Sequence, residues 1–143
     1  MSTTFVIFVL CFGTLLAAET KCKGSKVSPE VKQQILDYHF ARREGDGVEW
    51  DCGLEAKARG LLKKGGKIDK DKVARRHGVN VYEIKKETET IKDLVNRVLG
   101  QWWSSSEETN LNMRNRQNKK VGCSYKDGKE DFVIACVFEK RGM

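Results

Sequence analysis

One histidine of this chain combines an ionisable ring with a setting in which that ring could do chemistry. In "ILDYHFARRE", residues 35–44, His39 lies among apolar and aromatic neighbours, one helical turn ahead of Arg43. Histidine is the commonest metal ligand in proteins and a frequent general base. His77 is the only other histidine. We therefore weigh two hypotheses for His39, a ligand or catalyst and a core residue with a polar tip.

Catalysis by His39 would also need a nucleophile within its reach. The serine run 104–106 lies on no G-x-S-x-G turn, and the cysteines that follow the N-terminal apolar run are expected to be paired. We therefore predict that the protein is not an enzyme and carries no cofactor.

The chain opens with an apolar run, Phe5–Leu16, which is followed by the small residues Ala17 and Ala18. The run is well short of the roughly twenty residues that span a bilayer. This order is typical of a secretory signal peptide over residues 1–18, cleaved after Ala17 or Ala18; the alternative is a buried N-terminal helix. No later run is apolar enough to span a membrane. We expect a secreted, extracellular protein with a single domain over residues 19–143.

Cysteine usage agrees with an oxidising compartment. Cys11 falls within the signal peptide, and an even number of cysteines remains. In a secreted chain these predict two disulfides, for which the sequence permits three connectivities. A metal site is disfavoured because no C-x-x-C pair is present and neither histidine has ligand spacing. The four cysteines are Cys22, Cys52, Cys123 and Cys136.

The chain is basic, with a formal net charge of +7, and its charge is uneven. Residues 63–78, "KKGGKIDKDKVARRHG", concentrate the excess. Such a run is usually a solvated loop, and its functional interpretation is contact with an anionic glycan, a membrane surface or an acidic protein. Nucleic acid is disfavoured because no aromatic residues interleave the run. The basic residues are Lys63, Lys64, Lys67, Lys70, Lys72, Arg75 and Arg76.

Three helices are predicted from apolar periodicity and capping residues. The first begins after Ser28, with Pro29 at its first position. The second covers residues 52–62 after Asp51, and the third covers residues 89–103, capped by Thr88 or Thr90. The apolar face of the first helix is expected to hold Val31, Ile35, Leu36, His39 and Phe40.

Strands are predicted over residues 79–84 and in a C-terminal hairpin. The hairpin pairs residues 119–125 with 131–139 around the turn Asp127–Gly128. A helical turn is expected around Leu111–Met113. Because the strands do not alternate regularly with helices, we predict an α+β domain whose helices cover an antiparallel sheet.

The motifs of these segments, taken in order, resemble those of the CAP superfamily, also called SCP/TAPS, which includes venom-allergen-like and cysteine-rich secretory proteins. "ILDYHFARR" and "VEWDCGLEAKA" resemble a helix with H-N-x-x-R followed by L-x-W-D-x-x-L. "GVNVY" resembles the G-E-N box, "VNRVLGQWW" the helix ending in W-Y-x-E, and "IACVFEKRG" the closing V-C-N-Y-x-x-x-G. Nematode members are the most similar. The matched residues are His39, Arg43, Trp50, Asp51, Leu54, Gly78, Asn80, Val81, Tyr82, Trp102, Met113, Val121, Gly122, Cys123, Cys136, Phe138 and Gly142.

The resemblance implies an α-β-α sandwich with a small antiparallel sheet covered by helices. In the family, two histidines and two glutamates line a cleft that can hold a divalent metal such as zinc. Of these four family positions, only one still holds its ligand residue, a histidine. Glu107 or Glu108 would replace a lost glutamate only if the serine run holds a local insertion. We therefore predict a degenerate site without metal. The four matched positions are His39, Val79, Ser105 and Thr109.

The resemblance also implies that Cys123 pairs with Cys136, and the pairing of Cys22 with Cys52 then follows by exclusion. Family members act outside cells on host or partner proteins, which makes a non-enzymatic binding or modulatory role the leading expectation. The alternative is a lipid- or sterol-binding protein. We expect His39 to be a half-buried remnant of the cleft, hydrogen-bonded locally. An apolar groove for the alternative would be lined by Val79, Tyr82, Trp102, Trp103 and Phe138.

Overall fold

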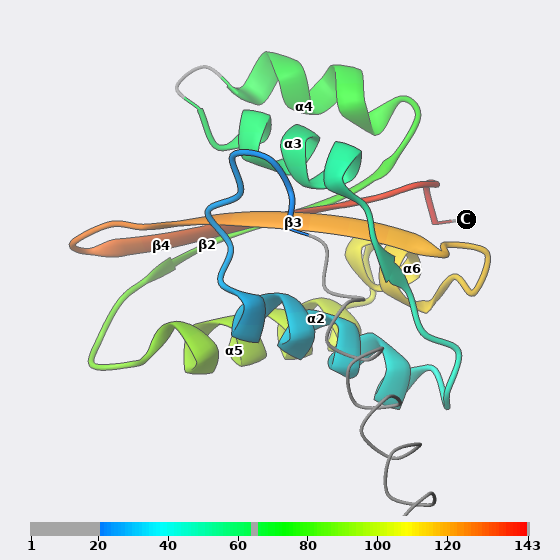
Figure 1. Cartoon of the computed structure of the whole chain (residues 1–143), viewed down its shortest axis with the longest axis horizontal. Coiled ribbons are helices and arrows are strands. Elements are labelled where there is room, and N and C mark those ends of the chain that lie inside the picture. The colour runs from blue at the N-terminus through cyan, green and yellow to red at the C-terminus, as the bar shows by residue number, and fades with distance from the viewer. Residues whose placement is uncertain (1–20, 64–65, 143) are drawn as a thin grey trace, which may run out of the picture.

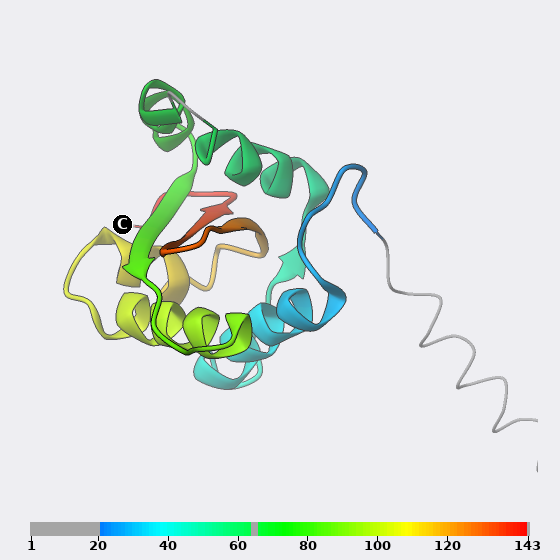
Figure 2. The same ribbon diagram turned by 90° about the vertical axis from the view of Figure 1, so that its left-hand side faces the viewer.

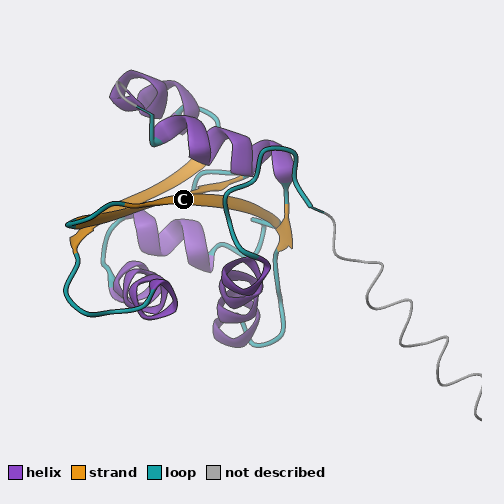
Figure 3. Ribbon diagram, turned by 60° about the vertical axis from the view of Figure 1, so that its left-hand side comes forward, coloured by secondary structure: helices purple, strands orange, loops and turns teal. Residues whose placement is uncertain are grey.

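The computed structural model describes residues 21–63 and 66–142, and in Gly66–Ala74 the side chains from residue 70 onward. The predicted signal peptide lies outside the described residues. Helices cover both faces of one central sheet (Figures 1 and 3). In the described part of the chain, no helix is long and apolar enough to cross a membrane. The α+β class and the layered arrangement expected from the sequence are confirmed.

The sheet has four strands in the order β1-β3-β4-β2. These are β1 (Glu49–Trp50), β2 (Gly78–Lys85), β3 (Lys120–Asp127) and β4 (Asp131–Phe138). The last three pair antiparallel, as predicted. The expectation of a purely antiparallel sheet is wrong, because β1 runs parallel to β3 as the chain returns from the first helix.

Three helices cover the face of the sheet that holds the larger core. They are α2 (Pro29–Arg42), α5 (Ile91–Ser104) and α6 (Glu108–Arg114). Ser28 caps α2 and Thr90 caps α5, as their positions predict. Their apolar faces pack with alternate residues of β4, including Phe132, Ile134 and Phe138. Phe40 does not join this face and is 57% exposed, because it packs at the turn after α2 against Gly47.

The opposite face of the sheet is covered by α3 (Cys52–Leu61) and α4 (Gly66–Ala74) (Figures 1 and 2). Asp51 caps α3. Gly122 lets this helix approach β3, since a Cβ there would lie 2.0 Å from the backbone nitrogen of Glu55. We call residues 63–78 the basic segment, and the expectation that this segment is a loop is wrong. A helix forms because Val73 packs beside the small core of Leu54, Ala58, Ala135 and Val137.

Candidate functional site

Five polar side chains are buried together with the core in the region where the family motifs place a cleft. His39 and Arg43 come from the first helix and its end, and Asn80 comes from β2. Asn112 lies in α6, and Asn118 lies in the loop that leads to β3. None of them is more than 2% exposed. We call these five residues the buried polar cluster.

The ring of His39 is completely buried, not half-buried as expected from the sequence. Its Nδ1 lies 2.8 Å from the carbonyl oxygen of Ile35, and because a carbonyl only accepts, Nδ1 carries the proton. Burial lowers the pKa of His39 to about 4, an effect that the nearby charge of Arg43 reinforces. The imidazole is therefore neutral at pH 7.

The other ring nitrogen, Nε2, carries a free lone pair in this tautomer. It is buried and has no hydrogen-bond partner among the described residues. The ring centroid lies 5.6 Å from that of Phe138, so an apolar ring forms part of its surroundings. His39 is thus held as a core residue by one local hydrogen bond.

Arg43 is a buried cation bonded to main-chain carbonyls. Its Nε donates to the carbonyl of Met113 at 2.6 Å, and one terminal nitrogen donates to that of Asn118 at 2.8 Å. Burial lowers the pKa of Arg43, although a guanidinium remains charged at all physiological pH values. No salt bridge to Arg43 exists among the described residues. Arg43 therefore joins the end of α2 to α6 and to the loop between α6 and β3.

Two asparagines connect β2, α6 and the C-terminal segment. Asn112 donates to the side-chain oxygen of Asn80 at 2.8 Å, and Asn80 donates to the carbonyl of Thr109 at 3.0 Å. The side-chain oxygen of Asn112 accepts from the backbone of Gly142 at 2.7 Å. Each amide is thus satisfied between elements that are distant in sequence.

Asn118 holds the segment that follows β4. Its side chain accepts from the backbone N–H of Lys140 at 2.7 Å and donates to the carbonyl of Lys140 at 2.8 Å. It also donates to the carbonyl of Asn112 at 3.1 Å. Sequence reasoning missed Asn112 and Asn118. The available signal was the run of four asparagines between residues 110 and 118, all outside the predicted strands.

The structure does not gather the other three tetrad positions around His39. Val79 pairs with Val137 of β4, and strand alternation puts both on the face covered by α3. Ser105 is the C-cap of α5, where its hydroxyl accepts from the backbone of Glu107 at 2.9 Å. Thr109 lies in α6 and contributes its carbonyl to Asn80. Of the two nearby glutamates, Glu107 is exposed, and Glu108 is exposed and paired with Arg141 at 3.0 Å.

The five residues proposed for an apolar groove are divided between the two faces of the sheet. Trp102 and Phe138 are buried in the main core, whereas Tyr82 is 36% exposed. Val79 belongs to the opposite face of the sheet. Trp103 is partly buried, with the guanidinium of Arg114 4.8 Å from its ring. These residues do not line a common groove.

The described basic residues of 63–78 lie along the α3–α4 side of the molecule. Lys63, Lys70 and Lys72 are exposed, and so are Arg75 and Arg76 in the turn between α4 and β2. Lys64 and the side chain of Lys67 lie outside the described residues. Their role as a contact for an anionic partner stays a prediction.

The sequence profile of a family described as "Ancylostoma-associated secreted protein related" matches residues 18–138, most of the chain. The chain belongs to this family. The resemblance to nematode members of the CAP superfamily is thereby confirmed. No curated protein matches this family member significantly in sequence.

Solved structures share the fold of this family member at low sequence identity. The Ancylostoma-secreted protein Ac-ASP-7 aligns with a TM-score of 0.66 and 21% identity over 85% of this chain and 75% of its own. Na-ASP-1 aligns with a TM-score of 0.65 and 17% identity over 87% of this chain, and this chain spans only 40% of that protein. NaASP2, solved with Zn²⁺, aligns with a TM-score of 0.63 and 13% identity over 82% of this chain and 83% of its own.

The described residues around His39 do not fit a zinc ion. In residues 21–63 and 66–142, no group of three or more His, Cys, Asp or Glu side chains is placed to hold a metal. The polar neighbours of His39 are the carbonyl of Ile35 and the guanidinium charge of Arg43. Zinc prefers three or four imidazole, thiolate or carboxylate ligands, and a nearby cation would repel it.

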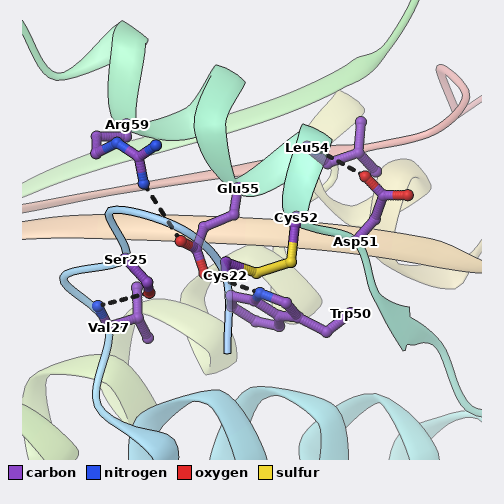
Figure 4. The surroundings of a disulfide bond; sticks show 9 residues. All are labelled: Cys22, Ser25, Val27, Trp50, Asp51, Cys52, Leu54, Glu55 and Arg59. Carbon is purple, nitrogen blue, oxygen red and sulfur yellow. Dashed lines mark hydrogen bonds and ion pairs between the residues drawn. A yellow bond between two sulfur atoms is a disulfide. The ribbon is translucent and has the colours of Figure 1, made fainter. Parts of the chain in front are cut away.

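Both disulfides of this family member have the pairing that the resemblance implied. Cys123–Cys136 joins directly opposed residues of β3 and β4. Cys22–Cys52 ties the N-terminal segment to the start of α3, where Figure 4 shows it beside Trp50 and Glu55. The Trp50 indole donates to the buried Glu55 carboxylate at 2.9 Å, and Arg59 pairs with that carboxylate at 3.3 Å. Two disulfides are typical of an oxidising compartment.

Proposed function

We propose that this chain is a secreted, non-enzymatic extracellular binding or modulatory protein whose family-type metal site has degenerated. The observation that carries the proposal is the enclosure of His39, whose ring is buried and neutral and whose free nitrogen faces no second ligand among the described residues. A group that substrate or metal cannot reach performs no chemistry. Its role is to fill and orient the core.

The partner then binds at the surface of the protein, and the net positive charge of the chain favours an anionic partner. The net charge of +7 raises the local concentration of anions around the molecule and their rate of encounter. The prominent cations are those of the basic segment, Lys63 to Arg76. An anionic glycan fits this surface better than an acyl chain does, because the residues suggested for an apolar groove are dispersed.

Secretion is proposed from the apolar start of the chain and from the family. When the full chain is expressed in animal cells, it should appear in the medium with an N-terminus created after Ala17 or Ala18. Retention inside the cell with the first 18 residues still attached would contradict this part of the proposal.

An extracellular binding screen tests the rest. The purified mature chain is presented to arrays of glycans and of extracellular protein domains, in parallel with a folded His39→Gln variant. The proposal predicts saturable binding that is equal for both proteins. Binding or turnover that is lost with His39 would show that the enclosed ring is functional.

A further inference from the structure

Three segments that are distant in sequence meet in one hollow of about 390 Å³. The turn between α4 and β2 contributes Arg75 and Arg76, and the segment after β4 contributes Lys140 and Arg141. The loop between α6 and β3 adds the amides Asn115 and Gln117. In both Figure 1 and Figure 2 the C-terminal segment ends between the α4–β2 turn and α6. We call these six residues the basic hollow.

The basic hollow has a strong excess of positive charge. Its lining contains four cations and no carboxylate. Of these four cations, only Arg141 has an ion pair with a described residue. Its partner, Glu108, is about half exposed. Exposed pairs of this kind contribute little. Four cations against one carboxylate leave an excess of three charges, which an anionic ligand would neutralise.

The backbone that carries these cations is fixed in advance. The hydrogen bonds of Asn118 hold both backbone groups of Lys140. The backbone of Arg76 donates to Val73 at 3.1 Å, and that of Gln117 donates to the side chain of Asn115 at 3.0 Å. A preorganised site loses less conformational entropy when a ligand binds.

We propose that the basic hollow binds a sulfated oligosaccharide. Its volume lies within the range of about 300 to 1,000 Å³ that is usual for ligand sites, which leaves room for sugar rings beside the sulfates. Guanidinium groups offer paired donors to oxyanions, and Asn115 and Gln117 offer donors and acceptors to sugar hydroxyls. No aromatic ring lines the hollow for base stacking, and no apolar side chain lines it for an acyl chain.

This inference rests on the proposed extracellular binding function, because sulfated glycans occur outside cells. The direct test is calorimetry of the mature chain with a heparin hexasaccharide at 0.15 M salt. Saturable binding is expected, together with its loss when the hexasaccharide is desulfated. Equal binding of the desulfated sugar would overturn the assignment. So would retention on phosphatidylserine vesicles that depends on Arg75 and Arg76 when the hexasaccharide fails to bind.

A pair of charge reversals locates the site. Arg75→Glu with Arg76→Glu should weaken hexasaccharide binding at least tenfold. The matched control, Lys126→Glu with Lys129→Glu, makes the same change of net charge at exposed positions of the β3–β4 hairpin, outside the lining of the hollow, and should weaken binding less than threefold. Equal losses in the two variants would mean that net charge, and not the hollow, attracts the glycan.

Folding does not obscure this result. Both pairs of residues are exposed, and thermal melts should show native-like transitions; Arg75→Gln with Arg76→Gln serves as a milder second variant. If the hexasaccharide does not bind but the extracellular screen finds another ligand, the basic hollow is wrongly assigned and the proposed function stands. If neither binds, both are wrong.

Discussion

The side-chain amide of Asn118 makes two hydrogen bonds with the backbone of Lys140, at 2.7 and 2.8 Å, and thereby pairs like a short strand with the segment after β4. Asn118 is fully buried, while Lys140 projects into the basic hollow. Arg43 donates to the carbonyl of the same asparagine. The buried polar cluster therefore supports a charged surface, and its members need no chemical role to account for their burial.

Replacement of Asn118 by alanine should lower the free energy of unfolding by about 2 to 4 kcal/mol, because it leaves the buried carbonyl of Asn112 and the partly buried backbone groups of Lys140 without the partner they have in the native protein. Urea denaturation measures the change. The control Gln101→Ala, at an exposed position of α5, should stay within about 0.5 kcal/mol of wild type. A similar, small effect of both substitutions would show that the segment after β4 does not depend on Asn118.

The free energy of unfolding should decrease as the pH is lowered, because His39 takes up a proton when the protein unfolds. Its folded-state pKa of about 4 lies below the unfolded value of 6.5, so between these values the unfolded chain binds a proton that the folded chain refuses. The contribution is fully present above pH 6.5 and is lost as pH falls toward 4, by about 3 kcal/mol in total.

Urea denaturation at pH 7 and pH 4 of wild type and of His39→Gln isolates this contribution from those of the carboxylates. The variant should lose about 3 kcal/mol less over that interval. An identical loss in the two proteins would mean that His39 titrates normally and is not enclosed.

Two glycines should respond to alanine in opposite directions. At Gly122 the new Cβ would lie 2.0 Å from the backbone of Glu55, so α3 and β3 would have to separate, at a cost of about 3 kcal/mol or more. At Gly60, inside α3, nothing lies within 4 Å, and alanine should stabilise by about 0.5 to 1 kcal/mol. Thermal melts check both. A destabilised Gly60→Ala with an unaffected Gly122→Ala would contradict the packing of α3.

Elements with strong local signals were predictable from the sequence. Ser28 with Pro29 marks the start of α2, and the hairpin turn at Asp127–Gly128 marks the ends of β3 and β4. The helix α4 was not predictable from the sequence, because its stability comes from tertiary packing of Val73 against a core formed by distant residues. The parallel strand β1 is only two residues long, so its pairing depends on the path of the whole chain and not on local preference.

The candidate site was predictable only in part. The motif pattern identified His39 and the loss of its partners, but not the depth of its burial, which depends on contacts such as that with the ring of Phe138 from the distant strand β4. The roles of Asn112 and Asn118 depend on contacts with Lys140 and Gly142 near the end of the chain. No periodicity within the asparagine-rich segment encodes those contacts.

Zinc calorimetry tests the central claim, that the family-type site is closed and the protein acts without metal. The mature wild-type chain and a folded His39→Ala variant are titrated with ZnCl₂ at pH 7. We predict no zinc binding at micromolar concentrations that distinguishes the two proteins. Micromolar binding by the wild type that disappears in His39→Ala would contradict the account, since it would place a working metal ligand where the structure has an enclosed, neutral core histidine.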